Sequence, residues 1–232
     1  MKRKSITLTI CILAVLALAS IGFASWIISN PNSGDVADGT IWVDDVESQV
    51  FDVETTLSVT SIQFGVPTDY QAKATDWLTN DSGKTESLET VLTVVIKPET
   101  GANLNDTLNA ASLGVTLSGI AGSDELTFEE LSQRFTNAGL AAPVITIKNP
   151  SNSEWVAFTD GKIDFADLDV DETAGTGTCE IKVTFGWGTN GNPYTYYNGV
   201  GRSYDTHREE AETFLNGVYN ALNGLSYKIT IK

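Results

Sequence analysis

Two runs near the C-terminal end of the chain alternate strictly between apolar and polar residues, and this alternation limits the fold more than any other feature. The first run covers residues 179–187, with apolar Cys179, Ile181, Val183, Phe185 and Trp187; the second covers residues 225–232, with apolar Leu225, Tyr227, Ile229 and Ile231. A period of two places all apolar side chains on one face of an extended strand. Each run therefore predicts a strand with one buried and one wet face, as in an antiparallel β-sandwich.

Other runs rich in β-branched and aromatic residues, bounded by Asp, Gly or Pro, predict further strands. They cover residues 41–43, 55–66, 88–96, 113–118, 143–148, 154–158 and 162–166. The run 88–96 is apolar on both faces, which is typical of a central strand. The last two runs are joined by Asp160-Gly161, and this dipeptide predicts a β-hairpin.

Two amphipathic helices interrupt the strands. The first begins with a capping box, in which the Thr127 hydroxyl accepts a hydrogen bond from the Glu130 N–H, and it ends at Gly139. The second runs from about Asp205 to Asn223 and carries an apolar stripe. Strands and helices do not alternate regularly, which disfavours a parallel α/β sheet. We therefore expect a mainly β protein, an antiparallel sandwich with two inserted helices as lids on a sheet.

A targeting segment precedes these elements. Three basic residues, Lys2 to Lys4, are followed by an uncharged apolar stretch over residues 6–28. Small residues before Ser25 fit the site that a signal peptidase reads, with cleavage between Ala24 and Ser25. The same stretch is also long enough to cross a bilayer as an uncut anchor. Cleavage is the leading interpretation.

The chain therefore divides into three expected parts. Residues 1–24 form a signal peptide or an uncleaved membrane anchor, and residues 39–232 form the β-sandwich domain. Between them, residues 25–38 include the turn-forming sequence Asn-Pro-Asn-Ser-Gly-Asp and form an extended linker. This organisation predicts a protein that is secreted or held at the extracellular cell surface, with signal peptidase as a processing partner.

The chain is strongly acidic. Its formal charge is −16 at pH 7, and removal of the three basic residues of the leader makes it −19. An acidic surface repels nucleic acid and anionic lipid headgroups. We therefore expect no nucleic-acid partner, and membrane contact only through the N-terminal segment. Cys179 is the only cysteine outside the leader, which leaves no intramolecular disulfide in the mature chain, and we expect it to face a core.

The sequence lacks the residues of the common catalytic sites. A single histidine, His207, cannot supply the His-Glu-x-x-His zinc site, which needs two histidines one helical turn apart. No Gly-x-Ser-x-Gly elbow, phosphate loop or dinucleotide fingerprint is present. Paired carboxylates stay open as a site, because sequence spacing does not show which of them converge. We expect a protein that is not an enzyme.

Four acidic residues form the best candidate for a bound ion: Asp167, Asp169, Asp171 and Glu172. They lie at an expected strand end, and calcium binds where several carboxylates converge from one loop. Their spacing does not match a helix–loop–helix calcium loop. A plain hydrated loop without any cofactor is the alternative.

Residues 187–204 combine Gly and Asn with four aromatic residues that are candidates for a ligand or partner surface: Trp187, Tyr194, Tyr196 and Tyr197. Exposed aromatic side chains in such a loop can stack on sugars or bind a partner. The alternative is a structural flap, in which the rings pack over the edge of a sheet.

The N-terminal region also resembles a known family. A small-residue-rich leader ends near Trp26, and after a short linker residues 36–43 read Val-Ala-Asp-Gly-Thr-Ile-Trp-Val. This pattern is similar to the start of the TasA/camelysin family of Gram-positive surface and biofilm-matrix proteins. The resemblance implies a jelly-roll sandwich that polymerises by donor-strand exchange, with residues 25–36 completing a sheet of the next subunit.

Two functions follow as hypotheses. The first is a secreted structural subunit of an extracellular or biofilm-matrix filament, which associates with itself or with other matrix and surface subunits. The second is a membrane-tethered surface module that binds glycans or mediates adhesion through the Tyr-rich 187–204 loop.

Overall fold

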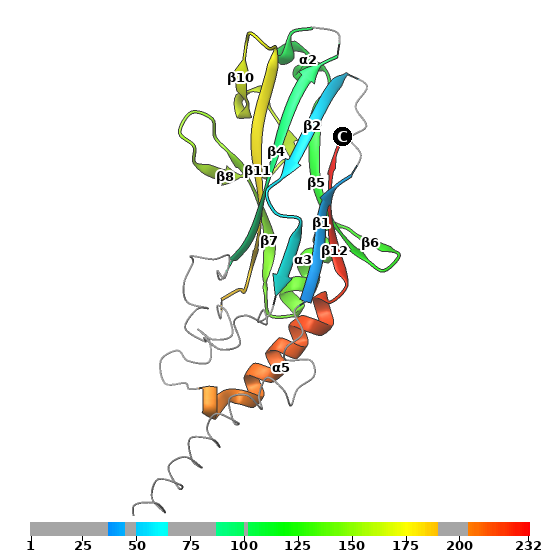
Figure 1. Ribbon diagram of the computed structural model, residues 1–232, viewed down its shortest axis with the longest axis vertical. Helices are drawn as coiled ribbons and strands as arrows, with labels where there is room; N and C mark the ends of the chain where they lie inside the picture. Colours follow the sequence, from blue (N-terminus) through cyan, green and yellow to red (C-terminus); the bar gives the residue numbers. More distant parts are fainter. Residues whose placement is uncertain (1–36, 45–49, 65–86, 100–101, 190–203) are drawn as a thin grey trace, which may run out of the picture.

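The computed structural model describes residues 37–44, 50–64, 87–99, 102–189 and 204–232, and these residues form a mainly β structure of two sheets (Figure 1). The first sheet has the order β3 (Ser61–Phe64), β1 (Ala37–Val43), β12 (Leu225–Ile231), β5 (Leu113–Ala121), β6 (Asp124–Leu126), and β9 (Lys162–Ile163) also pairs with β5. The second has the order β2 (Phe51–Leu57), β4 (Ser87–Pro98), β11 (Thr176–Gly186), β7 (Ala141–Lys148), β8 (Trp155–Ala157), and β10 (Asp169–Asp171) also pairs with β11.

Three α-helices and one 3-10 turn join these strands. They are α2 (Leu104–Ala110), α3 (Phe128–Asn137), α5 (Tyr204–Leu222) and the turn η3 (Phe165–Asp167). The predicted capping box of α3 is confirmed: the Glu130 N–H donates to Thr127 Oγ1 at 3.3 Å, and the Thr127 N–H donates to Glu130 Oε2 at 2.8 Å. Neither α2, β6 nor β10 carries a sequence signal that predicted it.

The two alternating runs form central strands, as predicted. β11 lies between β4 and β7, and its residues alternate between buried and half-buried from one end to the other. β12 lies between β1 and β5. β4 is also central and buries Leu92, Val94 and Ile96 completely, as its apolar pattern indicated.

The predicted strand 55–66 is in fact two strands in different sheets. β2 ends at Leu57 in the second sheet and β3 begins at Ser61 in the first. The crossing is held by the fully buried Thr90, whose hydroxyl donates to the Val59 carbonyl at 2.8 Å and accepts from the Val59 N–H at 3.2 Å. A side chain from another strand therefore fixes a bend that β propensity alone does not reveal.

The hairpin predicted at Asp160-Gly161 is wrong. β8 pairs with β7 in the second sheet, whereas β9 pairs with β5 in the first. Gly161 adopts the left-handed conformation that the turn signal predicts, with φ of 66°. Its carbonyl accepts a hydrogen bond from the Val115 N–H at 2.7 Å, so the turn joins β5 instead of returning the chain to β8.

The sandwich is not wholly antiparallel. β1 runs parallel to β12, with Ile41 beside Tyr227 and Val43 beside Ile229, while every other strand pair among the described residues is antiparallel. β1 begins at Ala37, two residues before the expected domain start at residue 39.

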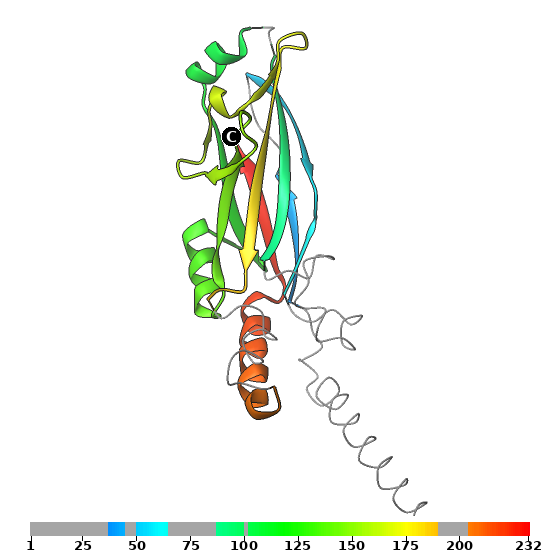
Figure 2. The ribbon, with the colours of Figure 1, turned by 90° about the vertical axis from the view of Figure 1, so that its left-hand side faces the viewer.

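The two predicted helices take different positions. α3 lies against β7 and β5, as expected of a lid. α5 instead extends away from the end of the sandwich, and only its C-terminal part meets the sheets (Figure 2). Val218 and Leu222 are buried there. None of the helices in the described part of the chain is long and apolar enough to cross a membrane.

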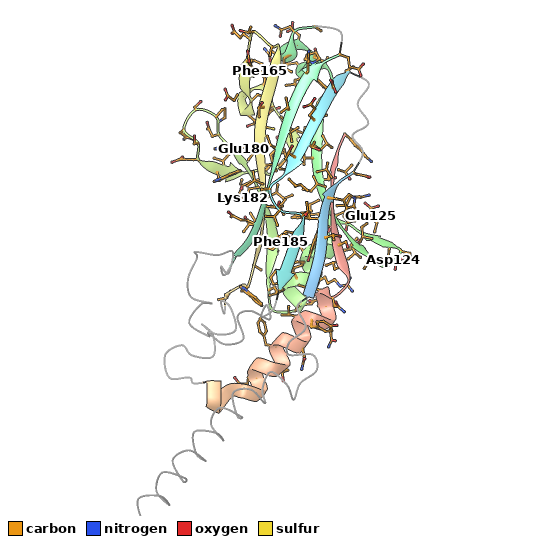
Figure 3. All side chains as sticks on the ribbon, in the orientation of Figure 1. Asp124, Glu125, Phe165, Glu180, Lys182 and Phe185 are labelled. Atoms are coloured by element: carbon orange, nitrogen blue, oxygen red, sulfur yellow. The ribbon has the colours of Figure 1, made fainter. Side chains whose placement is uncertain are left out.

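An aromatic cluster fills the space between the sheets near α3. Its members are Phe64, Phe135, Phe185, Trp187 and Tyr227, each 5% exposed or less. Phe185 and Tyr227 come from the two central strands, and their ring centroids are 4.7 Å apart (Figure 3). Aromatic pairs at this separation add to the stabilisation from burial alone. The cluster therefore joins the two sheets at this end of the sandwich.

Candidate functional site

β1 is the first described strand, and its contact with β12 requires a glycine. A Cβ atom added at Gly39 would lie against the Leu225 carbonyl oxygen and 2.6 Å from the Tyr227 ring. A methyl group has no room at such a separation, and the carbonyl belongs to the backbone of a central strand. The glycine of the Ala37-Asp38-Gly39-Thr40 motif thus allows β1 to approach β12.

Hydrogen bonds and one lysine hold the far end of β1. The Asp44 N–H donates to the Ile229 carbonyl at 2.8 Å. Lys228 Nζ lies 2.7 Å from Glu125 Oε1 and 3.5 Å from Asp44 Oδ2, so it connects β12 to both β6 and the end of β1. The hydrogen bond from Lys228 lowers the pKa of Glu125, and the same bond raises the pKa of Lys228. These partly exposed ion pairs contribute little energy, so the backbone pairing with β12 is the main contact that holds β1.

β2 forms an open edge of the second sheet. It pairs with β4, and at the two ends of the pairing the Ser58 N–H donates to the Val91 carbonyl and the Glu99 N–H donates to the Val50 carbonyl. The backbone N–H and C=O groups of the even-numbered residues of β2 therefore point toward β4. The alternation of an antiparallel ladder then points the backbone N–H and C=O of Val53, Thr55 and Leu57 away from β4. No strand in the described part of the chain pairs with β2 on this side.

The four calcium candidates do not converge. Asp167, in η3, accepts from the Asp164 N–H at 2.9 Å, and Asp171 accepts from the N–H groups of Thr173 and Ala174 at 2.9 and 3.0 Å. Asp169 and Glu172 are exposed. No group of three or more His, Cys, Asp or Glu residues that could hold a metal occurs among the described residues, which include all four candidates. Two of these carboxylates therefore stabilise local turns in this structure.

These hydrogen bonds give a test of a structural role. Asp171→Ala removes the acceptor of two backbone N–H groups, and we expect it to lower the free energy of unfolding by about 1 kcal/mol in urea. Asp169→Ala is the matched control, with an expected change within about 0.5 kcal/mol, because Asp169 is equally exposed on the same short strand but accepts no side-chain hydrogen bond within the described part of the chain. An increase of several degrees in melting temperature on adding millimolar calcium, lost in both variants, would restore the calcium interpretation.

Trp187 is a core residue and not part of a ligand surface. It is 5% exposed, and its ring centroid lies 5.2 Å from that of Phe64 and 6.4 Å from that of Phe214 on α5. A ring packed between a strand and a helix has no free face for a sugar. The other three aromatic candidates, Tyr194, Tyr196 and Tyr197, lie outside the described residues.

Two buried groups are chemically inert. Burial raises the pKa of the Cys179 thiol to about 12, so this side chain stays protonated and unreactive at neutral pH. Burial likewise raises the pKa of the Tyr227 phenol. Cys179 faces the core, as predicted. The processing residues Ala24 and Ser25, the segment 25–36 and the side chain of His207 lie outside what the structure describes.

Two features remain as a candidate site. They are the close packing of β1 on β12 at Gly39 and the open edge of β2. In the sequence Gly39 stands out only as part of a family pattern, and its close approach to Leu225 and Tyr227 is visible only in the structure. The outward-facing backbone of β2 was not predicted, because it depends on which partner strand occupies the other side.

Comparisons with known proteins add no family to this chain. No protein-family model matches it, and neither a curated protein nor a solved structure is found to match. The resemblance of residues 19–43 to the TasA/camelysin pattern therefore rests on those residues alone.

Proposed function

We propose that the protein is a secreted structural subunit of an extracellular or biofilm-matrix filament. In this proposal the leader is cut between Ala24 and Ser25, the sandwich is of the jelly-roll type, and the domain has no enzymatic activity. Subunits join by donor-strand exchange, in which residues 25–36 of one copy add to a sheet of the next.

The observation that supports the proposal is the pair of edge strands β2 and β3. Each pairs on one side only within the described residues: β2 with β4, and β3 with β1. A sheet edge of this kind presents backbone N–H and C=O groups that a strand of another chain can satisfy. Donation from each copy to the next is a head-to-tail contact that does not close, so it makes a fibre.

The chain order also fits a donor segment. Residues 25–36 directly precede β1, and β1 is fixed against β12 by the close contact at Gly39. A donor segment must be attached to a strand that stays in its own domain, because otherwise the pull of the next subunit would unfold the donor. The Lys228 ion pairs and the Asp44 hydrogen bond hold the other end of the same strand.

Electron microscopy of the protein recovered from cells tests this proposal. We expect filaments from the intact mature chain and none from a variant that lacks residues 25–36. A second variant, with residues 25–36 in scrambled order, controls for length and composition and is also expected to remain unassembled. Monomers from the intact mature chain at high concentration, at both neutral and acid pH, would contradict the proposal.

A further inference from the structure

The open edge of β2 leaves apolar side chains partly exposed, in addition to its outward-facing backbone groups. Val53 and Leu57 point to the inner face of the second sheet and pack against the core, yet each is only half-buried. Figure 2 shows β2 along the right-hand border of the sandwich, and no described strand pairs with it on that side. Asp52, Glu54 and Thr56 point to the outer face and are exposed. The strand therefore offers alternating apolar and polar positions to a partner.

A second copy of β2 matches this edge. Two copies can pair antiparallel about a two-fold axis, because their outward backbone groups are identical and each can satisfy the other. Both strands are already folded in their own sheets. Pairing therefore orders no additional backbone, in contrast to the binding of an extended peptide.

The positions of the two acidic residues exclude two of the possible registers. If the two-fold axis passes between the two copies of Val53, Asp52 lies opposite Glu54 of the other copy. If it passes between the two copies of Glu54, those two glutamates lie opposite each other. Like charges directly opposite one another are destabilising. An axis at Thr55 instead places Glu54 opposite Thr56 and Asp52 opposite Ser58. On the inner face the same register brings Val53 against Leu57.

An axis at Thr56 also separates the acids but shortens the overlap. It places Val53 opposite Val59, which lies beyond the end of β2 at Leu57, in the crossing to β3. Of the two registers that keep the acids apart, only the axis at Thr55 pairs Val53, Thr55 and Leu57 with one another.

We propose that two copies of this chain associate through β2, antiparallel and in register about Thr55, which joins their second sheets into one continuous sheet. The contact is a closed two-fold contact, distinct from the head-to-tail contact of the filament, and it does not depend on the leader or on residues 25–36. In a filament it would link neighbouring subunits laterally.

Charge substitutions at Thr56 test the register without touching the core. Thr56→Glu places two glutamates opposite the two copies of Glu54, and we expect the dimer dissociation constant, measured by sedimentation equilibrium, to rise roughly two- to thirty-fold. Thr56→Lys places lysines there and should lower it by a similar factor. Ser112→Glu and Ser112→Lys make the same charge changes at an exposed site between α2 and β5, and they should leave the constant within about two-fold.

Disulfide trapping gives an independent readout of the same register. We expect a mixture of Glu54→Cys and Thr56→Cys chains to cross-link, since opposite residues lie within disulfide range, and each variant alone to cross-link at least about ten-fold more slowly. Cys11 is replaced by alanine in both chains, and Cys179 is buried and protonated, so neither competes.

The outcomes separate this contact from other uses of the edge. Equal cross-linking in all three samples, or a dissociation constant indifferent to charge at Thr56, overturns the proposal. Association that is lost on removal of residues 25–36 but unaffected by Thr56→Glu overturns it as well, and assigns the edge to the N-terminal segment. A dimer that responds to Thr56 while no filament forms would support this contact and contradict the proposed function.

Discussion

Replacing Gly39 by alanine should lower the free energy of unfolding by about 3 kcal/mol, the upper part of the range for overpacking. The added methyl group would meet the Leu225 carbonyl oxygen and come within 2.6 Å of the Tyr227 ring. Neither neighbour can move without disturbing the core. The Leu225 carbonyl belongs to the backbone of a central strand, and the Tyr227 ring packs against Phe135 and Phe185. The strain is relieved only if β1 moves away from β12.

Gly114→Ala is the control for this variant. Gly114 lies on β5, which pairs with the other side of β12, and the nearest atom to an added Cβ there is the Lys232 carbonyl oxygen at 3.5 Å, an ordinary contact. We expect no destabilisation and a gain of up to about 1 kcal/mol, since only the general glycine-to-alanine effect on the unfolded chain remains. Urea unfolding of both variants measures the difference. Equal destabilisation would mean that the contact at Gly39 is not what positions β1.

The local elements of this fold were predictable because their signals are local. The alternation of β11 and β12 is a property of each strand alone, and it survives whichever neighbours the strand takes. The capping box of α3 is completed within four residues, from Thr127 to Glu130. The buried position of Cys179 followed from the same alternation.

The connections between elements were not predictable in the same way. The chain does bend at Asp160-Gly161, with Gly161 in the left-handed conformation, but the bend does not decide which sheet receives the next strand. The Val115 N–H donates to the Gly161 carbonyl and thereby joins this segment to β5. The bend between β2 and β3 depends on Thr90, which is thirty-one residues from Val59 in sequence. The parallel pairing of β1 with β12 joins the first and last described strands, and no pattern within either one reveals it.

The candidate sites were harder to judge from the sequence for a related reason. The carboxylates near residue 170 are close in sequence, yet those of Asp167 and Asp171 accept hydrogen bonds from their own turns. Trp187 fitted two interpretations, as the last inner position of an alternating strand and as the first aromatic of a Gly-rich loop. Its packing between Phe64 and Phe214 shows that the strand pattern was the better guide.

Phe135→Ala should be the most destabilising substitution in the aromatic cluster, with an expected loss of about 4 kcal/mol in the free energy of unfolding. Phe135 is fully buried on α3, and its ring contacts both sheets: Phe64 and Tyr227 in the first, at centroid distances of 5.7 and 6.2 Å, and Phe185 in the second, at 5.6 Å. Removing the ring leaves a cavity lined by three other rings that are themselves held by their strands, so the site cannot collapse.

Phe128→Ala makes the same change on the same helix, at a position where the ring is 40% exposed. Its removal loses little burial, and alanine is the better helix former, so we expect a change within about 1 kcal/mol. The two variants therefore separate the loss of the ring between the sheets from any effect on α3 itself. Guanidinium unfolding of both variants measures the difference in the free energy of unfolding. If the two losses were similar, α3 would stabilise the domain through its helix ends and not through Phe135. A loss of about 4 kcal/mol is a large fraction of the stability of an ordinary domain, so Phe135→Ala should also lower the melting temperature markedly.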